Sequence, residues 1–247
     1  MAILGIDIGG SGIKGALVEV ETGNLAGDRH RLLTPEGGKP EDVAKMVKTL
    51  VESFNYKGVI GCGFPAVVLQ GVAKSAANIS SDWVGTDVNK LLGDASGCPV
   101  FTLNDADAAG IAEMEFGVGR DIQKGVVLLL TLGTGIGTVL FSDRQLVPNM
   151  EFGHLKIRGK DAELRASDAI RQQKHFHWKK YAKRLQEYLD EMEKLFSPDI
   201  IVIGGGLSKK FALFAPYIKV HSKILPAQLL NQAGIVGAAV YASRQGF

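Results

Sequence analysis

The sequence predicts an α/β protein of two lobes that face each other across a cleft. Each half of the chain opens with two apolar runs joined by a glycine-rich turn, at residues 2–20 and 125–141. Stretches with apolar residues at helical spacing are interspersed between further short apolar runs. No Pro- and Ser-rich linker separates the halves. We therefore expect residues 1–110 to form an N-terminal α/β lobe and 111–230 a C-terminal α/β lobe, with the helix at 231–247 packing back on the first.

Short apolar runs bounded by turn residues predict the strands of the N-terminal half. These runs lie at 2–8, 13–20, 25–33, 58–63 and 100–103. After Pro40, apolar residues at three- and four-residue steps predict a helix over 41–54. An alanine-rich stretch predicts a second helix from 105 to about 116.

The C-terminal half predicts strands at 125–132, 138–141 and 200–203. A stripe of aromatic and aliphatic residues at three- and four-residue steps predicts a long amphipathic helix from Trp178 to Phe196. We interpret that stripe as a core-facing surface and not as a binding site. Further helices are expected to open at 204–206 and to cover 231–244.

Composition is typical of a folded cytoplasmic protein. Of the 247 residues, 46% are apolar and 22% are charged, which is ordinary for a globular chain and wrong for a disordered one. Cys62 and Cys98 sit in or beside apolar runs, which indicates buried thiols and neither a disulfide framework nor a zinc site. No signal-peptide pattern and no apolar stretch of about 18 residues is present, so we expect a cytoplasmic location and no membrane partner.

Charge is distributed unevenly along the chain. Residues 1–150 hold 12 Lys and Arg against 17 Asp and Glu, whereas residues 151–247 hold 16 against 9. Many of the cations lie between Lys156 and Arg184, and those from Arg171 to Arg184 form a cluster. A solvated helix surface and a field that gathers a polyanion explain this cluster equally well. Nucleic acid is not an expected partner, because no helix-turn-helix, zinc-finger or RNA-binding signature occurs.

Two glycine-rich turns predict a phosphate site: Asp7-Ile-Gly-Gly-Ser-Gly-Ile-Lys14 and Thr131-Leu-Gly-Thr-Gly-Ile-Gly137. Both join a strand to a strand, so neither is a dinucleotide fingerprint, and the second lacks the Lys-Ser/Thr of a Walker loop. Glycines at such turns let backbone N–H groups point outward and a phosphate approach closely. The alternative is that both turns are merely tight hairpins without a ligand, and a third glycine turn at 203–206 disfavours it. The predicted donor-binding residues are Asp7, Gly9, Gly10, Ser11, Gly12, Lys14, Gly133, Thr134, Gly135, Gly137, Gly204, Gly205 and Gly206.

Asp7 is the predicted Mg²⁺ ligand, directly or through water. It leaves an apolar strand, where a charge is costly unless it is compensated, and Mg²⁺ prefers oxygen ligands and bridges phosphates. Capping of the following turn is the alternative role. Lys14 lies within reach of the same turn and would neutralise a bound phosphate.

The stretch Thr102-Leu-Asn-Asp-Ala-Asp107 places oxygen-bearing side chains where a strand ends and a helix begins. Phosphoryl transfer to an alcohol needs a carboxylate that accepts the hydroxyl proton, and we expect Asp105 to be that base. Asn104 is expected to bind a neighbouring sugar hydroxyl. One of these residues is expected to serve only as the helix N-cap, and Asp107 is our choice.

A second polar cluster, Glu151-Phe-Gly-His154, combines a carboxylate and an imidazole in one turn. Such a pair suits hydrogen bonding to vicinal sugar hydroxyls, although a lone His such as His154 is as often structural. The other wall of a sugar site is expected to contain Gly63, Phe64, Pro65 and Asn78. Trp83 offers a flat face to a sugar ring, but we favour a core position for it.

These motifs together resemble the ROK family of bacterial sugar kinases. The first and second glycine turns resemble its phosphate motifs, Asn104-Asp105-Ala106 its catalytic turn, and 151–154 its sugar-binding Glu-x-Gly-His. Residues 203–206 resemble its glycine turn near the nucleotide base. The resemblance spans nearly the whole chain in the expected order. It implies a two-lobed actin-like ATPase (ribonuclease H-like) fold with an interdomain cleft, and a homodimer.

One departure from the family pattern is informative. Most members follow Glu-x-Gly-His with a cysteine cluster that holds zinc and then a sugar-binding glutamate, whereas residues 151–163 contain no cysteine. Zinc is therefore not expected, and the short chain resembles the polyphosphate glucokinase branch. The resemblance suggests that Glu163 replaces the lost glutamate, and that Lys156 and Lys160 join Lys14 in binding polyphosphate.

The resemblance implies Mg²⁺-dependent phosphorylation of glucose on its 6-hydroxyl, with polyphosphate and also ATP as donors. A strictly ATP-dependent glucokinase, hexokinase or mannokinase of the same family is the nearest alternative. A sugar-responsive repressor of the family is disfavoured, because repressors carry an N-terminal DNA-binding extension and the phosphate strand here starts at residue 2. A nucleotide-switched scaffold is disfavoured by Asn104, Asp105 and Glu151.

Overall fold

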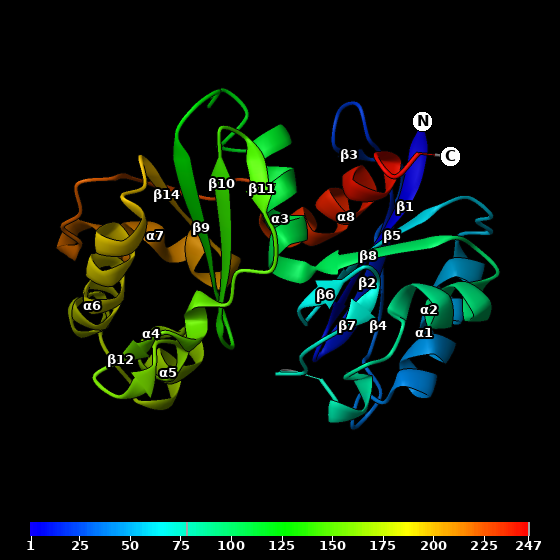
Figure 1. Cartoon of the computed structure of the whole chain (residues 1–247), viewed down its shortest axis with the longest axis horizontal. Coiled ribbons are helices and arrows are strands. Elements are labelled where there is room, and N and C mark those ends of the chain that lie inside the picture. Colours follow the sequence, from blue (N-terminus) through cyan, green and yellow to red (C-terminus); the bar gives the residue numbers. More distant parts are fainter. Residues whose placement is uncertain (78, 247) are drawn as a thin grey trace. The chain divides into compact units, whose positions relative to one another are not determined.

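The computed structural model describes residues 1–77 and 79–246. The chain divides into two compact units (Figure 1). Met1–Phe116 and Gln232–Phe247 form the first unit, and Gly117–Asn231 form the second. Segments from both ends of the chain therefore build the core of the first unit.

The first unit is built on a six-stranded sheet of order β3-β2-β1-β5-β8, with β4 also paired to β2. Strands β1 and β2 are antiparallel, whereas β1, β5 and β8 run parallel. The parallel strands are apolar and almost wholly buried, as strands covered on both faces require. The strands are β1 (Ala2–Gly9), β2 (Gly12–Glu19), β3 (Asn24–Leu25), β4 (His30–Leu32), β5 (Ile60–Phe64) and β8 (Val100–Asn104).

Two pairs of helices flank this sheet in Figure 1. Helices α1 (Pro40–Ser53) and α2 (Val88–Ser96) contact each other and contribute apolar residues to the same core cluster as the strands. Helix α3 (Asp105–Glu115) packs along α8 (Ala233–Ser243), and α8 also contacts β1 and β5. The small hairpin β6 (Val68–Leu69) and β7 (Val72–Ala73) and the 3₁₀ turn η1 (Ser81–Trp83) complete the unit.

Glycines allow α8 to approach the sheet and α3 at backbone distance. A Cβ atom at Gly61 of β5 would lie 1.9 Å from the carbonyl oxygen of Ala238. One at Gly237 of α8 would lie 1.6 Å from the carbonyl oxygen of Ala108 in α3. No side chain fits at either position, so these two glycines set the spacing of three elements.

The second unit has a five-stranded sheet of order β11-β10-β9-β14-β15. Strand β9 is antiparallel to β10 and parallel to β14. Its strands are β9 (Val126–Leu132), β10 (Ile136–Ser142), β11 (Gln145–Val147), β14 (Ile200–Gly204) and β15 (Lys223–Pro226). A separate hairpin consists of β12 (Lys156–Ile157) and β13 (Lys160–Asp161).

Helix α6 (Trp178–Phe196) buries its predicted apolar stripe against this sheet. Tyr181, Leu185, Tyr188 and Met192 are fully buried there, which confirms the interpretation of the stripe as a core face. The remaining helical segments are η2 (Phe152–His154), α4 (Glu163–Ala166), α5 (Asp168–Gln173), η3 (Gly205–Lys210), α7 (Phe211–Phe214), η4 (Ala215–Tyr217) and η5 (Leu230–Gln232).

One local prediction is wrong. The single strand expected over 25–33 is two short strands, β3 and β4, because Gly27 at φ +135° turns the chain between them. The glycine turn at 204–206 opens a helix as predicted, and this helix is the 3₁₀ segment η3, which precedes the single turn of α7. In the described ranges, 1–77 and 79–246, no helix has the length and apolar character needed to cross a membrane.

Replacing Gly237 by Ala tests the spacing of α8. Helix propensity alone favours alanine by about 1 kcal/mol, but the added methyl meets the Ala108 carbonyl. We expect Gly237→Ala to lower the free energy of unfolding by about 3 kcal/mol, the upper range for overpacking, in a chemical denaturation experiment. Gly206→Ala is the control, since a Cβ there meets no atom within 4 Å. Equal stability of both variants would contradict the packing described.

Candidate active site

The first glycine turn joins β1 to β2 beside an ion pair. In the strand register Asp7 lies opposite Lys14, and Gly9 lies opposite Gly12. The Lys14 ammonium lies 3.0 Å from Asp7 Oδ2, and the two side chains are 29% and 18% exposed. Lys14 therefore lies at the turn, as its sequence position predicts, and it compensates the charge of Asp7.

Arg31 is a second cation at this turn, and sequence reasoning missed it. Strand β4 pairs with β2 so that Arg31 lies opposite Lys14. Its Nη2 donates to the Ser11 carbonyl oxygen at 3.4 Å, and a Cβ at Gly12 would lie 2.8 Å from its Nε. The guanidinium thus lies directly against the turn, where it can bind an anion together with Lys14.

The first turn opens onto a pocket of about 440 Å³. Gly10 forms part of its wall, and most of the remainder comes from residues 34–38 and from Ile79 and Ser80. The Thr34 hydroxyl donates to the Gly9 carbonyl oxygen at 2.5 Å, which fixes the end of β1. The turn is therefore held in place and also has space beside it for a ligand.

The predicted acceptor turn lies where β8 ends and α3 begins. Asn104 caps the helix, because its Oδ1 accepts from the N–H groups of Ala106 at 2.9 Å and Asp107 at 3.1 Å. Its amide nitrogen donates to the Ala66 carbonyl oxygen at 3.1 Å. The expectation that Asp107 serves as the cap is wrong, since Asp107 lies in the first turn of the helix with its side chain buried.

Asp105 is the first residue of α3 and is half-buried. Its Oδ1 accepts from the N–H of Ala106 at 2.8 Å. Gly63 lies close behind it, because a Cβ at Gly63 would be 3.6 Å from the Asp105 Cα atom. The predicted base is thus held at the amino end of a helix, where the helix dipole favours a carboxylate.

The predicted sugar wall is only partly available to a ligand. Phe64 is fully buried and its ring packs on Trp83 at 4.6 Å between centroids, so only its main chain can contact a substrate. The Trp83 indole N–H donates to the Gly38 carbonyl oxygen at 2.8 Å, which agrees with a core role. Pro65 follows at the end of β5 and is half-buried. Asn78 lies outside the described residues.

The register of the parallel strands brings the first turn and the acceptor turn to one edge of the sheet. Asp7 of β1 pairs with Gly63 of β5, and Gly63 pairs with Leu103, directly before Asn104 and Asp105. Ligands of open α/β sheets bind at the carboxyl ends of the strands. The phosphate turn and the predicted base therefore share the edge where such a site is expected.

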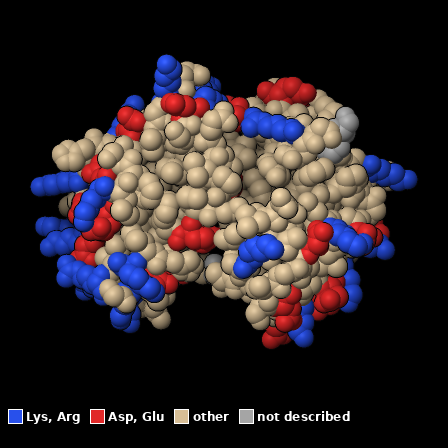
Figure 2. All heavy atoms as spheres, in the orientation of Figure 1, with Lys and Arg blue, Asp and Glu red and all other residues tan. Residues whose placement is uncertain are grey.

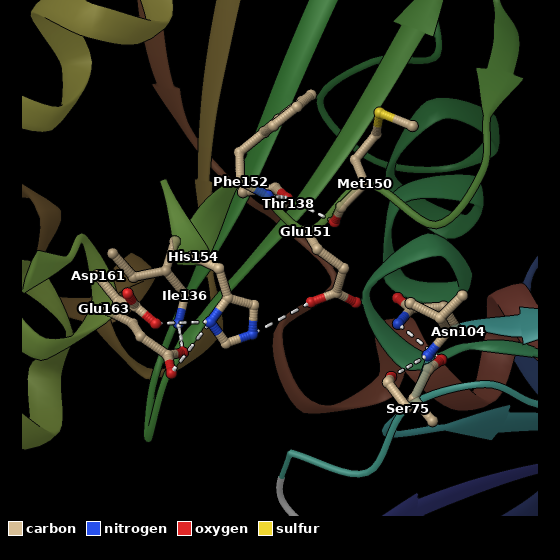
Figure 3. A network of polar contacts seen from close by, with 12 residues as sticks. Ser75, Asn104, Ile136, Thr138, Met150, Glu151, Phe152, His154, Asp161 and Glu163 are labelled. Carbon is tan, nitrogen blue, oxygen red and sulfur yellow. Dashed lines mark hydrogen bonds and ion pairs between the residues drawn. The ribbon is translucent and has the colours of Figure 1, made fainter. Parts of the chain in front are cut away.

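In the second unit, His154 lies among three carboxylates (Figure 3). Its Nδ1 is 3.0 Å from Asp161 Oδ2 and 3.9 Å from Glu163 Oε1, and its Nε2 is 3.8 Å from Glu151 Oε2. Since a carboxylate accepts hydrogen bonds, Asp161 orients the ring with a proton on Nδ1. Glu151, His154 and Glu163, all predicted as sugar ligands, are thus gathered in one cluster.

Close backbone packing holds this cluster on β10. A Cβ at Gly153 would lie 2.3 Å from the Ile136 carbonyl oxygen, so only glycine fits. The Thr138 hydroxyl donates to the Met150 carbonyl oxygen at 2.6 Å and accepts from the Phe152 N–H at 3.0 Å (Figure 3). The spacing Glu-x-Gly-His is therefore a structural requirement of this turn as well as a chemical one.

Asp161 is the second residue that sequence reasoning missed. It lies opposite Lys156 in the hairpin, and the two side chains form an ion pair. The hydrogen bond from Lys156, and then that from His154, lowers the pKa of the Asp161 carboxyl. Lys156 thus contacts the His154 cluster through Asp161. The sequence predicted only a role in donor binding for it. Lys160 is exposed on β13.

The carboxyl of Glu151 has a raised pKa. Burial, the largest cause, raises the pKa of its carboxyl, and the neighbouring Glu163 raises it further, while His154 opposes the shift. A carboxyl with a raised pKa in a cluster of polar groups is typical of a functional site.

The second and third glycine turns meet at the carboxyl ends of β9 and β14. Gly204 pairs with Thr131, and Gly205, at φ +70°, would place a Cβ 2.8 Å from the Leu132 nitrogen. The turn at 133–137 is anchored at both sides, because the Ala169 N–H donates to the Gly133 carbonyl oxygen at 3.1 Å and the Ile136 N–H donates to Glu163 at 3.4 Å. Glu163 thereby joins this phosphate turn to the His154 cluster.

The donor set at Asp7 fits Mg²⁺ that arrives with a phosphate. One oxygen of Asp7 contacts Lys14, and Mg²⁺ is commonly held by one or two carboxylates together with substrate phosphates and water. Across residues 1–77 and 79–246, no group of three or more His, Cys, Asp or Glu side chains is arranged to hold a metal ion by itself.

Comparisons with known proteins agree with these motifs. The ROK family model matches residues 3–167. A polyphosphate glucokinase from Mycobacterium tuberculosis is 44% identical over 237 residues, which cover 96% of this chain and 89% of that protein.

Solved structures extend the comparison to the fold. The inorganic polyphosphate/ATP-glucomannokinase from Arthrobacter sp. strain KM matches with a TM-score of 0.95 at 43% identity and covers 99% of both chains. A ROK family glucokinase from Streptomyces griseus, in complex with glucose and AMPPNP, shares the fold with a TM-score of 0.84 at 24% identity. The predicted fold class is therefore confirmed.

The raised pKa of Glu151 predicts a pH-dependent stability. A carboxyl whose pKa is higher in the folded state stabilises the fold only while it is protonated, and that contribution is lost as pH rises from its unfolded to its folded pKa. The free energy of unfolding of Glu151→Gln, measured by denaturant titration, should therefore rise relative to the unmodified protein as pH increases above the ordinary pKa of a glutamate.

Glu193→Gln is the opposite-sign control. Burial of Glu193 is outweighed by hydrogen bonds from the Ser222 hydroxyl and N–H at 2.6 and 2.7 Å, so its pKa is lowered. This variant should lose stability relative to the unmodified protein as pH rises toward the ordinary pKa of a glutamate, and the difference should stay constant above it. A flat difference for Glu151→Gln, with the expected trend for Glu193→Gln, would contradict the raised pKa of Glu151.

Proposed function

The chain belongs to the ROK family, and from this premise we propose that it is a kinase that phosphorylates the 6-hydroxyl of glucose with inorganic polyphosphate as donor. The polyphosphate glucokinase at 44% identity and the polyphosphate/ATP-glucomannokinase at 43% identity support this activity. The observation that carries it is the shared sheet edge of the first glycine turn and Asp105 in one unit. A donor turn and a base at one edge are what transfer to an alcohol requires.

Asp105 acts as the general base. It accepts the proton of the 6-hydroxyl while that oxygen attacks the terminal phosphorus of the donor, and the bridging oxygen leaves with the rest of the phosphate chain. Its place at the first turn of α3, backed by Gly63, holds the carboxylate at a fixed position. Such positioning lowers the barrier, because the translational and rotational entropy that the reactants would lose in water is lost on binding instead.

The donor phosphates bind at the glycine turns. Outward amides, Lys14 and Arg31 compensate the charge at the first turn, and the amides at 133–137 and 204–206 do so in the second unit. Mg²⁺ bound with the donor supplies further charge neutralisation, and Asp7 is the residue that would hold it, directly or through water. Electrostatic positioning of this kind provides most of the rate enhancement in phosphoryl transfer.

The sugar hydroxyls bind to the His154 cluster and the acceptor turn. Glu151 and Glu163 accept hydrogen bonds from hydroxyl groups, and His154, oriented by Asp161, presents its Nε2 atom. In the first unit, the Asn104 amide and the main chain at 63–65 are further proposed sugar ligands. A site whose polar groups pair with the hydroxyl groups of a hexose disfavours molecules that lack those hydroxyl groups.

ATP is proposed as a second donor and mannose as a second acceptor. Both rest on the similarity to the Arthrobacter protein, a polyphosphate/ATP-glucomannokinase. We further propose a cytoplasmic homodimer, as the family resemblance implies. Light scattering of the purified protein should give a mass near twice the 26.4 kDa of one chain.

A donor comparison tests the proposed function. Glucose, Mg²⁺ and either polyphosphate or ATP are supplied separately, and glucose 6-phosphate is measured by a coupled dehydrogenase. Product from polyphosphate is expected, and product from ATP is expected in addition. Product from ATP alone would remove polyphosphate from the proposal and leave a glucokinase of the same family.

Asp105→Asn tests the base. We expect kcat to fall about 10²-fold or more, while the dissociation constant for glucose, measured by calorimetry, changes little because shape and polarity are kept. Asp94→Asn is the matched control, since Asp94 is an exposed residue of α2 paired with Lys90. A kcat for Asp105→Asn close to that of the control would exclude Asp105 as the base.

Arg31→Gln tests the cation that sequence reasoning missed. Loss of one charged hydrogen-bond donor at the first turn should raise KM for either donor about tenfold, with KM for glucose unchanged. Lys45→Gln removes an exposed cation of α1 that pairs with Asp42 and serves as the control. Equal KM values for both variants would place Arg31 outside the donor site.

A further inference from the structure

The second unit carries a basic surface around the start of α6. Its cations come from three segments: the end of α5, the first half of α6 and the end of η3. We call it the α5–α6 basic surface, and it consists of Lys174, Lys179, Lys180, Lys183, Arg184, Lys209 and Lys210, with the rings of Phe176 and Trp178. Figure 2 shows Lys and Arg side chains gathered over the region where Figure 1 labels α5 and α6.

The two rings hold cations at fixed positions. Lys180 Nζ lies 4.5 Å from the centroid of Phe176, and the Arg184 guanidinium lies 5.8 Å from it. Lys210 Nζ lies 5.8 Å from the centroid of Trp178. Cation–π contacts of this kind restrain long side chains that would otherwise move freely in water. Three of the seven cations are therefore held in place by the two rings.

These cations have no acidic partners in the part of the chain that the structure describes. The carboxylate of Asp168, the acidic residue of α5, accepts hydrogen bonds from Arg171 at 2.6 Å and Gln172 at 2.7 Å. Other exposed lysines differ: Lys45 pairs with Asp42 and Lys90 with Asp94. Unpaired like charges gathered on one surface repel one another, and a bound anion relieves that repulsion.

The surface is continuous with both glycine turns of its unit. The N–H of Ala169, in the first turn of α5, donates to the Gly133 carbonyl oxygen at 3.1 Å. Arg171 of the same helix lies over Trp178 at 4.3 Å. On the other side, η3 runs from Gly205 of the third glycine turn to Lys210. A polyanion bound at the turns thus has basic side chains along both segments that leave them.

We propose that the α5–α6 basic surface binds the distal part of a long polyphosphate chain whose reacting end lies at the glycine turns. This inference rests on the proposed function and extends it with a second binding region for the same donor. ATP ends at its nucleoside and cannot extend onto the surface, so the surface favours long polyphosphate over ATP.

Inorganic polyphosphate fits this surface better than nucleic acid. Proteins that bind single strands present aromatic faces on which bases stack, but Phe176 and Trp178 are half-buried and their faces are covered by cations. What remains exposed is ammonium groups, which bind phosphate without reading bases. A chain of phosphates without bases can bind to all of these ammonium groups.

The triple variant Lys179→Gln/Lys180→Gln/Lys183→Gln tests the proposal. We expect its KM for long-chain polyphosphate to rise about tenfold, with KM for ATP and for tetraphosphate within about twofold of the unmodified protein. The slope of log KM for long polyphosphate against log salt should fall by about 2, at about 0.7 per charge removed for a single-stranded polyanion. The control Lys45→Gln/Lys48→Gln/Lys90→Gln removes the same charge from the first unit.

A binding experiment separates failure of this inference from failure of the proposed function. Fluorescently labelled long polyphosphate is titrated with Asp105→Asn protein, with and without the triple change, so that turnover is not needed. Weaker binding in the triple variant supports the surface. Absence of glucose phosphorylation from polyphosphate by the unmodified protein would instead count against the proposed donor, and the inference would fall with it.

Three results would overturn the surface alone. They are equal KM changes for long polyphosphate and ATP, equal losses in the triple variant and its control, and loss of single-stranded DNA binding without any change in KM for polyphosphate. The last would assign the surface to a nucleic acid.

Discussion

The site in the first unit depends on how closely α8 approaches the sheet. Gly61 and Gly237 leave no space for a side chain between α8, β5 and α3, so the carboxyl ends of the strands and the start of α3 are held in one arrangement. Asp7, Gly63 and Asp105 all lie at that edge. Strand pairing brings the donor turn and the base to this edge, and the close packing of α8 fixes the start of α3 against the sheet.

Most of the fold was predictable because apolar patterning decides it. The helix over 178–196 has its bounds and its buried face in the sequence, since an amphipathic period over about five turns has no competing interpretation. The division of 25–33 into β3 and β4 was not predictable, because it depends on one glycine in a positive-φ conformation. Short strands of two or three residues carry too few residues for a period to appear.

In the candidate site, sequence could identify residues in motifs but not residues placed by pairing. Short turns rich in polar residues indicate a functional site, and these turns contain Asp105, Glu151 and His154. Arg31 and Asp161 reach the site through strand register, on β4 and β13. Asp161 had a weak signal, because Arg158 and Gly159 form a two-residue turn with positive φ that sets Lys156 opposite it. The capping role of Asn104 depended on where the helix begins.

The central claim is that the 6-oxygen of glucose attacks a phosphorus atom of the donor. Glucose labelled with ¹⁸O at its 6-hydroxyl, incubated with the protein, Mg²⁺ and polyphosphate, tests it by mass spectrometry and ³¹P NMR. The account predicts glucose 6-phosphate that keeps the ¹⁸O atom in its ester bond. A phosphate on another hydroxyl, or loss of the label from the product, would contradict it.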